Sequence, residues 1–284
     1  MGKKLIITAA LCGAGTMKSQ TPYVPVTPEE IAEDAVACAK AGASIIHIHV
    51  RDEEGKNTME PSRFIYVMRM VQAALDKEGL TTILNPTTSG SKFPEEWRLG
   101  FMRELSPEMC SYDPNSMNWA NSYIFKNEPS LLEHLGTLCQ ELNCKPECEI
   151  FDGGFCTNVA YYVKKGFLTN PVHCQLVLGV SGAMPGTVES VSYLTRHLPE
   201  GATWSITGIG HSHMPMMLAG LAAGCDGLRV GLEDNIYLEK GVLATNVQLV
   251  ERACKIGIDV GREIATPEET RAILGLKGRA ASKL

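Results

Sequence analysis

Residues 27–50, TPEEIAEDAVACAKAGASIIHIHV, contain a helix, a stop signal and a strand in direct succession. Thr27 is placed to cap the helix, and Glu30 completes a capping box with it. The helical pattern ends at Gly42, a residue typical of helix ends. The apolar run 44–50 that follows predicts a strand covered on both faces. This stretch therefore predicts a helix that leads directly into a buried strand.

The same alternation of apolar strands and amphipathic helices continues along the whole chain. The predicted strands are 5–11, 44–50, 81–86, 109–112, 146–151, 172–179, 203–207 and 227–231. The predicted helices are 27–41, 61–77, 94–105, 129–142, 158–165, 187–198, 214–223 and 245–258, with an added C-terminal helix from residue 266. Eight strand–helix repeats in 284 residues predict a (β/α)8 TIM barrel of the α/β class.

A doubly wound sheet is the structural alternative. The first strand–helix junction, ALCGAG at residues 10–15, lacks the full dinucleotide-binding fingerprint, so the barrel is favoured. The chain shows no linker, low-complexity segment or second zone of composition. Residues 1–284 are therefore predicted to form a single barrel domain with the extra C-terminal helix.

Composition excludes several classes of protein. With 44% hydrophobic residues, 20% charged residues and a formal net charge of -6, the chain indicates a globular protein whose main partner is neither nucleic acid nor an anionic membrane. No run approaches the ~18 apolar residues of a membrane helix. The apolar run at the N-terminus is too short for a signal peptide and predicts the first core strand.

Ten cysteines are scattered through predicted strands and helices, and none forms C-x-x-C. This pattern predicts buried, reduced thiols and a cytoplasmic location rather than a secreted disulfide scaffold. Cys144 and Cys148 are close enough in sequence to suggest a metal pair, although plain structural thiols are the favoured interpretation.

In a TIM barrel, functional side chains lie at the carboxyl ends of the strands and in the loops that follow them. The candidates at these positions are His47, His49, Arg51, Asp52, Asn85, Thr87, Thr88, Ser89, Ser111, Asp113, Asn115, Glu147, Glu149, His211, His213, Arg229, Glu233, Asp234 and Asn235.

His47 and His49 are the most informative of these residues. They are two positions apart, so on a strand both point to the same face, while their neighbours suit packing against helices. Two inward imidazoles need only one carboxylate to form a zinc site with an open position. Glu233 shares the period-two phase of Arg229, and in a closed barrel its strand lies near that of the histidines. The alternative for either histidine is a hydrogen-bonded core residue.

Two further groups admit more than one interpretation. Arg229, beside Glu233 and Asp234, is suited to bind a substrate carboxylate or to hold a catalytic aspartate charged; the alternative is a salt bridge that closes the barrel. The run TTSG at residues 87–90 is suited to donate hydrogen bonds to a carboxylate or an enolate, or it is a plain loop cap.

A second His-x-His pair, His211 and His213, suggests rival enzymes. Metal-dependent aldolases and lyases carry such a pair on strand 7 with an acidic residue at the end of strand 1, where this chain has none. Amidohydrolases need histidines on strands 5 and 6, but strand 5 lacks one and His173 starts strand 6. The pair is left as either a substrate or supporting contact, or plain structure.

Ten segments in order resemble the β-keto acid cleavage enzyme family across essentially the whole chain. The segments are ITAALCGA, TPEEIAEDA, AGASIIHIHVRD, NPTTSG, PEMCSYDPNSMNW, PECEIFD, LVLGVSGAMPG, TWSITGIG, RVGLEDNIY and ATPEETRAILG. The resemblance implies a Zn2+-dependent barrel enzyme that condenses a β-keto acid with acetyl-CoA and releases acetoacetate and a new CoA thioester. It also implies a homo-oligomer, with a tetramer as one form.

The resemblance implies a role for particular residues. By position, the zinc ligands are His47, His49 and Glu233, the general base is Asp234, and Arg229 is coupled to that base. The substrate-binding positions are Thr87, Ser111, Glu149, Asn85 and Gly15. A base beside a dication and a guanidinium is expected to have a depressed pKa. The alternatives are a CoA-independent metal-dependent aldolase or lyase, and a non-catalytic zinc- or ligand-binding barrel.

Two positions depart from the family pattern. Members that act on an aminohexanoate have a glutamate in the loop after strand 1, where this chain has Gly15. We therefore expect the reaction type to be retained and the preference for a 5-amino substrate to be altered. The loop after strand 4 reads Asp113-Pro114-Asn115, where relatives often have Asn-x-Gly, which indicates a different shape for that loop.

Overall fold

A computed structural model describes residues 3–278 and 282–284. Eight parallel strands form one sheet, curved into a barrel, in the order β5-β2-β1-β12-β11-β10-β9-β6. The strands are β1 Ile6–Ala10, β2 Ile45–Ile48, β5 Ile83–Pro86, β6 Met109–Tyr112, β9 Lys145–Ile150, β10 His173–Leu178, β11 Thr203–Gly208 and β12 Gly227–Val230. Each of the eight predicted strands is present, and the TIM barrel prediction is confirmed.

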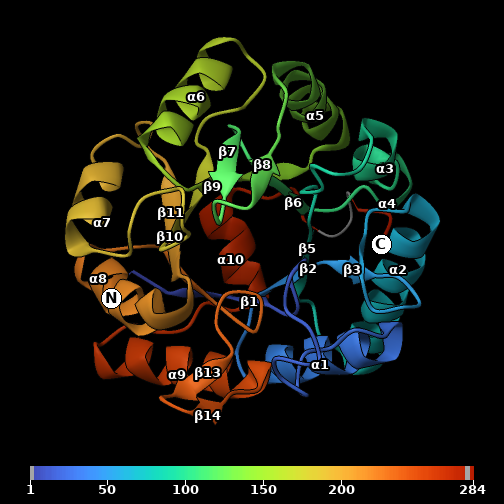
Figure 1. The fold of residues 1–284 in the computed structure, drawn as a ribbon, viewed down its shortest axis with the longest axis vertical. Coiled ribbons are helices and arrows are strands. Elements are labelled where there is room, and N and C mark those ends of the chain that lie inside the picture. Colours follow the sequence, from blue (N-terminus) through green and yellow to red (C-terminus); the bar gives the residue numbers. More distant parts are fainter. Residues whose placement is uncertain (1–2, 279–281) are drawn as a thin grey trace.

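Helices surround the sheet (Figure 1). They are α1 Pro28–Lys40, α2 Pro61–Lys77, α3 Glu95–Leu99, α4 Met102–Leu105, α5 Pro129–Leu142, α6 Gly153–Lys164, α7 Val188–Thr195, α8 His213–Ala222, α9 Asn246–Asp259 and α10 Pro267–Leu274. The capping box predicted at Thr27 and Glu30 is confirmed, with both reciprocal hydrogen bonds formed.

Two helix predictions are wrong in their bounds. The helix predicted over 94–105 is interrupted at Gly100, where a side chain would collide with Pro61 of α2. The helix predicted from residue 158 begins at Gly153 instead, because Asp152 caps it by accepting from two backbone N–H groups. The sequence pattern missed this start because two glycines at the beginning of a helix are a weak helical signal.

Hydrogen bonds that involve the side chains of Thr88 and Ser111, rather than a strand ladder, join β5 to β6 and close the barrel. The sheet of the described residues ends at these two strands. The backbone N–H of Thr88 donates to Ser111 Oγ at 2.9 Å, and Thr88 Oγ1 donates to the Ser111 carbonyl at 2.8 Å. Both residues are buried, so these two bonds satisfy backbone groups that would otherwise lack partners at the seam.

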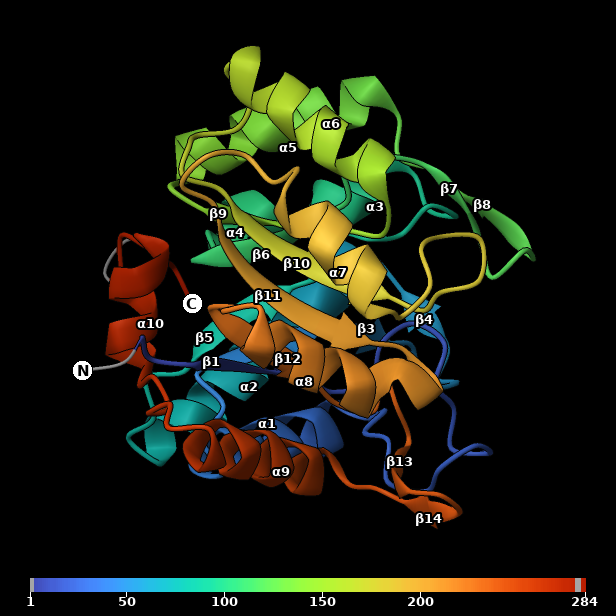
Figure 2. The ribbon, with the colours of Figure 1, turned by 90° about the vertical axis from the view of Figure 1, so that its left-hand side faces the viewer.

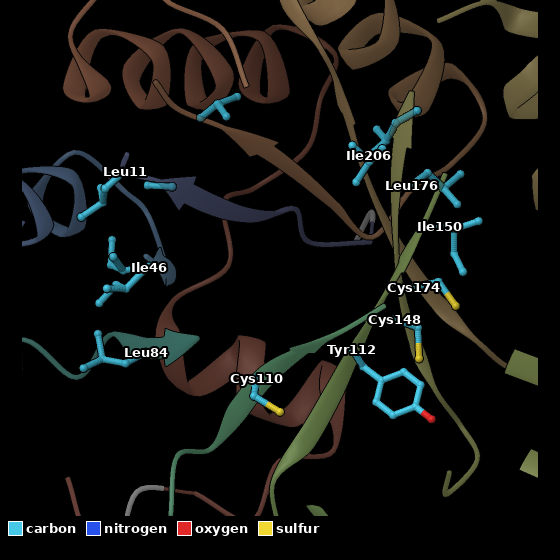
Figure 3. Packing of buried hydrophobic residues seen from close by; sticks show 14 of the residues in the cluster. Leu11, Ile46, Leu84, Cys110, Tyr112, Cys148, Ile150, Cys174, Leu176 and Ile206 are labelled. Atoms are coloured by element: carbon cyan, nitrogen blue, oxygen red, sulfur yellow. The ribbon is translucent and has the colours of Figure 1, made fainter. Parts of the chain in front are cut away.

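Alternate residues of each strand point outward into an apolar layer between the sheet and the helices (Figure 3). Ile46 and Ile48 belong to this layer. A smaller apolar cluster fills the amino-terminal end of the barrel, where Ile6, Ile45 and Met109 meet residues at and before α10. Figure 2 shows α10 at this end. The added C-terminal helix is thus present, and it closes the bottom of the barrel.

Three short antiparallel hairpins extend from the loops at the opposite end (Figure 2). They are β3 Val50–Arg51 with β4 Asn57–Thr58, β7 Met117–Trp119 with β8 Tyr123–Phe125, and β13 Tyr237–Glu239 with β14 Val242–Leu243. One apolar cluster joins most strands and helices. Because of this shared core, we propose that residues 1–284 form a single domain. None of the described helices has the length and apolar character needed to cross a membrane.

The seam between β5 and β6 yields a stability prediction. Thr88→Val keeps the side-chain shape but removes the hydroxyl that bonds the buried Ser111 carbonyl. We expect the free energy of unfolding to fall by about 1–2 kcal/mol, measured by urea denaturation. The matched control is Thr137→Val, on the exposed face of α5, which should change stability by less than ~0.5 kcal/mol. Equal effects of both substitutions would contradict a role of Thr88 in closing the barrel.

Candidate active site

Two histidines and a glutamate converge at the carboxyl ends of β2 and β12. His47 lies in β2 and His49 directly after it, with 1% and 5% of their surfaces exposed. His47 Nε2 is 3.7 Å from Glu233 Oε2, and His49 Nε2 is 3.4 Å from Glu233 Oε1. One donor atom from each of the three residues lies within 4.8 Å of the others.

The spacing of these three residues suits a metal ion better than hydrogen bonds. Ligand bonds of about 2.0–2.1 Å in a tetrahedral site place neighbouring donor atoms roughly 3.3 Å apart. The distances of 3.4 and 3.7 Å between the histidine nitrogens and Glu233 are near this value. Glu233 Oε2 is buried without a hydrogen-bond partner among the described residues. The donor set therefore fits a divalent cation of the zinc type.

Glu233 reaches the histidines by a turn, which corrects the sequence-based argument. β12 ends at Val230, and Gly231 follows with φ of 141°, a value that favours glycine. A Cβ at Gly231 would lie 2.0 Å from the Ala10 carbonyl oxygen, so β1 also excludes a side chain there. The Gly231 carbonyl then accepts from the backbone N–H of Asp234. Because of this turn, both Glu233 and Asp234 face the site, which a continued strand would not allow.

Arg229 holds three carboxylates together inside the barrel. Its Nη1 donates to Glu149 at 2.7 Å and its Nη2 to Glu233 at 2.6 Å. Nε and Nη2 donate to the two oxygens of Asp234 at 3.0 and 3.2 Å. Thr207 Oγ1 donates to Asp234 as well, at 3.0 Å. Arg229 is 3% exposed, so these charge-assisted bonds form away from water.

The neighbouring carboxyl groups of Glu233 and Asp234 have pKa values shifted in opposite directions. Burial alone would raise the pKa of Glu233, but Arg229 and the two histidines hold it well below its ordinary value. Burial raises the pKa of Asp234, and Arg229 only partly opposes this. The depressed pKa expected for Asp234 included the charge of a bound dication, and it stays a prediction for the metal-loaded site. Such a separation suits one carboxylate as a ligand and the other as a proton acceptor.

A second pair of acidic residues lies on the other side of Arg229. Burial raises the pKa of Glu149 well above its ordinary value, and the neighbouring Asp113 adds to the shift. Burial also raises the pKa of Asp113, whose carboxylate accepts a hydrogen bond from Ser89. Asp113 is both one of the candidates expected at the carboxyl ends of the strands and part of a departure from the family pattern. The structure shows that this departure lies next to a predicted substrate-binding residue.

The loop after β1 is fixed by Arg51, a residue whose role the sequence did not reveal. Its Nη2 donates to the carbonyls of Cys12, Gly13 and Thr16 at 2.6–2.9 Å. Gly13, with φ of 58°, lies so close to Glu233 that a Cβ would be 2.5 Å from its Cγ. Gly15 is exposed two residues later and has open space around its Cβ position.

The other predicted substrate-binding residues lie around the same end of the barrel. Ser111 is fully buried at the seam, and Thr87 Oγ1 accepts from the backbone N–H of Ser89. Asn85 pairs in register with His47, and its Nδ2 donates to Glu147 at 2.7 Å. The roles of these residues as substrate contacts stay predictions.

The second His-x-His pair does not converge on one site. His211 is exposed in the short 3₁₀ turn Gly210–Ser212, whereas His213 begins α8 and is 3% exposed. Burial lowers the pKa of His213 to about 4. The pair therefore lacks the common face that His47 and His49 share.

Residues 4–276 match the family model described as beta-keto acid cleavage enzyme. The chain belongs to this family. The resemblance found in the sequence is thereby confirmed over nearly the whole chain, and with it a family of enzymes that act on β-keto acids.

Two curated relatives and one solved structure illustrate the match. Over 278 residues, the chain is 40% identical to the 3-keto-5-aminohexanoate cleavage enzyme of Fusobacterium nucleatum subsp. nucleatum, covering 98% of this chain and 100% of the relative. Over 300 residues, it is 34% identical to the 3-dehydrocarnitine:acetyl-CoA trimethylamine transferase of Rhizobium meliloti, covering 98% and 99%. The fold resembles the apo structure of ObcA, with a TM-score of 0.77 and 20% identity over 90% of this chain and 66% of that chain.

Glu147, below the site, yields a prediction about pH. It is fully buried, and burial raises its pKa. The folded protein therefore keeps a proton on Glu147 at pH values where the unfolded chain has lost it, so stability falls as pH rises from about 4.3, the unfolded pKa, to the folded pKa. Glu147→Gln removes this titration and keeps an oxygen for Asn85. We expect the variant to become progressively more stable than the wild type across this interval.

Urea denaturation at a series of pH values measures this difference. The matched control is Glu96→Gln on the exposed surface of α3, which should leave the pH dependence of stability unchanged. If the free energy of unfolding changes with pH in the same way for the wild type and Glu147→Gln, then Glu147 does not hold a proton in the folded state.

Proposed function

We propose that this protein is a zinc-dependent β-keto acid cleavage enzyme. It condenses a β-keto acid with acetyl-CoA, and the products are acetoacetate and a new CoA thioester. One observation carries the proposal. The His47–His49–Glu233 cluster lies directly beside Asp234, a buried carboxylate oriented by Arg229 and Thr207. A structural zinc would need a fourth protein ligand and no adjacent base, so this arrangement favours catalysis.

Charge balance supports a divalent ion at this place. Arg229 bonds three carboxylates, those of Glu149, Glu233 and Asp234. Because burial raises the pKa of Glu149 well above its ordinary value, the count takes only Glu233 and Asp234 as ionised, and two negative charges with one positive charge leave a formal charge of -1 in a buried site. Buried charges of this kind need compensation. A zinc ion held by His47, His49 and Glu233 would provide it and, when bound, would polarise the 3-keto oxygen of the substrate.

The protein residues account for the proton transfer. Asp234 accepts the proton from C2 of the β-keto acid as general base. Arg229 holds the carboxylate through both oxygens, and Thr207 donates to the same group, so its orientation is fixed before substrate arrives.

Carbon–carbon bond exchange follows from this deprotonation. The C2 carbanion attacks the thioester carbonyl of acetyl-CoA and displaces the CoA thiolate. The thiolate then adds to the carbonyl carbon C3 of the original β-keto acid within the adduct. A retro-Claisen step then breaks the original C2–C3 bond, which leaves the remaining acyl group as the CoA thioester and gives the C2 carbanion of acetoacetate. This carbanion takes back the proton held by Asp234, and acetoacetate is released. As the family resemblance implies, we assign substrate contacts to Thr87, Ser111, Glu149, Asn85 and Gly15.

We also propose a homo-oligomer, with a tetramer as one form. The support is exposed apolar surface on two segments of the chain. Ile124 in the β7–β8 hairpin is 67% exposed, and Ile258 and Val260 at the end of α9 are 61% and 54% exposed. The cytoplasmic location stays a prediction from the sequence.

The proposed reaction is tested by acetoacetate formation from purified, zinc-loaded protein supplied with acetyl-CoA and a β-keto acid. We expect product only when acetyl-CoA is present, loss of activity with a chelator, and recovery with zinc. Asp234→Asn should lower kcat/KM by about a hundredfold or more, because general-base catalysis contributes on the order of 10²–10⁴-fold. The control Asp259→Asn, on the exposed face of α9, should retain full activity.

The same assay separates the alternatives. Cleavage of the β-keto acid without acetyl-CoA would indicate a metal-dependent aldolase or lyase. Bound zinc without any product would indicate a ligand-binding barrel. Full activity of Asp234→Asn would contradict the assignment of the base while leaving the overall reaction intact.

Gly15 yields a prediction about specificity. Its Cβ position has nothing within 4 Å, so Gly15→Glu should fold normally and place a carboxylate at the exposed loop. We expect the variant to favour 3-keto-5-aminohexanoate over an uncharged β-keto acid by about tenfold more than the wild type does, as one charge-assisted hydrogen bond would. The measurement is the ratio of kcat/KM for the two substrates.

Ala14→Glu is the matched control, because it adds the same charge one residue away on the same exposed loop. An equal shift in both variants would show a general charge effect of the loop rather than a substrate contact at position 15. A wild-type enzyme that already prefers the amino substrate strongly would contradict the expectation drawn from Gly15.

A further inference from the structure

Three buried cysteines from different parts of the chain meet outside the barrel. Cys110 lies in β6, Cys139 in the last turn of α5, and Cys144 directly before β9. Their three sulfur atoms lie within 4.8 Å of one another, and those of Cys110 and Cys139 are 3.5 Å apart. The sequence suggested Cys144 and Cys148 as a possible pair, but the structure groups Cys144 with Cys139 at the end of α5 and with Cys110, which is far away in sequence.

The backbone explains why the three sulfurs converge. Cys110 points outward, into the apolar layer that separates the sheet from α5. α5 ends at Asn143, whose φ of 55° reverses the chain. The backbone N–H of Cys144 then bonds the Cys139 carbonyl at 2.9 Å, which brings Cys144 back beside the helix. Pairing of β6 with β9 fixes the third side of the cluster, because Cys110 is opposite Pro146.

The cluster is dry and contains only sulfur. Cys110, Cys139 and Cys144 are 0%, 1% and 6% exposed. No histidine or carboxylate joins the group among the described residues. Three soft donors without oxygen or nitrogen select thiophilic metal ions.

We propose that Cys110, Cys139 and Cys144 form a second metal site, which binds one thiophilic d10 cation of the Cu(I) class through its sulfur atoms. Three sulfurs around a central ion at bonds of about 2.3 Å would be separated by roughly 4 Å. The separations here, from 3.5 Å to at most 4.8 Å, bracket that value. Binding would therefore need only small movements of the side chains.

The ligand number distinguishes Cu(I) from zinc. Structural zinc takes four ligands, and the described residues offer three at this place. Cu(I) is a soft ion that is stable with two or three sulfur ligands. Each thiol that ionises on binding the ion releases its proton to solvent, and no electrons are transferred. The ion enters as Cu(I) and remains Cu(I), so the site needs no oxidant or reductant.

The position of the site separates it from the proposed active site. Cys110 is the second residue of β6 and Cys144 precedes β9, so the cluster lies toward the amino-terminal ends of parallel strands. His47 and Glu233 lie at or beyond the carboxyl ends of their strands. In TIM barrels the amino-terminal face serves stability rather than chemistry. A bound ion would join β6, α5 and the start of β9, and it would stabilise the fold.

The test is an anaerobic titration of the reduced, zinc-loaded protein with Cu(I), supplied as its acetonitrile complex. We expect one equivalent to bind, with a thiolate-to-copper charge-transfer band in the ultraviolet and a sulfur-only shell in X-ray absorption. The melting temperature should rise on binding. Cys139→Ala should lower the affinity by at least about tenfold, since it removes one of three ligands. Cys144→Ala is a second variant with the same expected result.

Cys148→Ala is the matched control. Cys148 and Cys174 pair in register on β9 and β10 and are both fully buried, so this variant also removes a core thiol (Figure 3). It should bind Cu(I) like the wild type. The proposal is overturned if no sulfur-only copper species forms, if Cys139→Ala and Cys144→Ala bind as the wild type does, or if Cys148→Ala loses as much affinity. Nitrogen and oxygen ligands in the copper spectrum would assign the ion to the histidine cluster and would likewise overturn it.

Discussion

The buried guanidinium of Arg229 is the interaction on which the functional end of the barrel depends. It bonds Glu149 in β9 and both Glu233 and Asp234 in the turn that follows β12. Three carboxylates this close together would repel one another and be costly to bury without a cation between them. Removing one partner from such a group typically costs about 3–5 kcal/mol. The same contacts that permit burial also orient the proposed base.

The barrel provides the rigid frame that this cluster needs. One end is closed by α10 against an apolar layer, and the seam between β5 and β6 is closed by Thr88 and Ser111. The polar residues are therefore concentrated in the middle and at the other end, where the three hairpins extend. Arg51 fixes the loop after β1, and Gly13 of that loop contacts Glu233 so closely that no side chain fits. Positioning at the site is thus shared between loops and strands.

Part of the site could be predicted because period-two alternation is a local property. The inward direction of His47 follows from the apolar neighbours Ile46 and Ile48, which pack against helices as expected. Glu233 lies beside the two histidines as expected, but a turn rather than a continued strand brings it there. A turn at Gly231, enforced by the nearness of β1, decides where Glu233 and Asp234 point. Sequence alternation contains no information about such a contact between strands.

Other features depend on distance in the folded chain rather than in the sequence. Burial, which is not visible in the sequence, raises the pKa of Asp234 in spite of the partial opposition of Arg229. Cys110, Cys139 and Cys144 are scattered in the sequence and meet only because a strand, a helix end and a chain reversal bring them together. The role of Arg51 was missed for the same reason, since its partners are carbonyls of a distant loop.

The sequence by itself determined the eightfold strand–helix pattern, the family and the residue types available at the carboxyl ends of the strands, because these depend on local periodicity and on order along the chain. Only the tertiary structure decided which of those residues touch, which are dry and how their charges are balanced. It placed His47, His49 and Glu233 at ligand distances and gave neighbouring carboxyl groups opposite pKa shifts. The physical reason is that burial and close approach arise from packing between segments far apart in sequence.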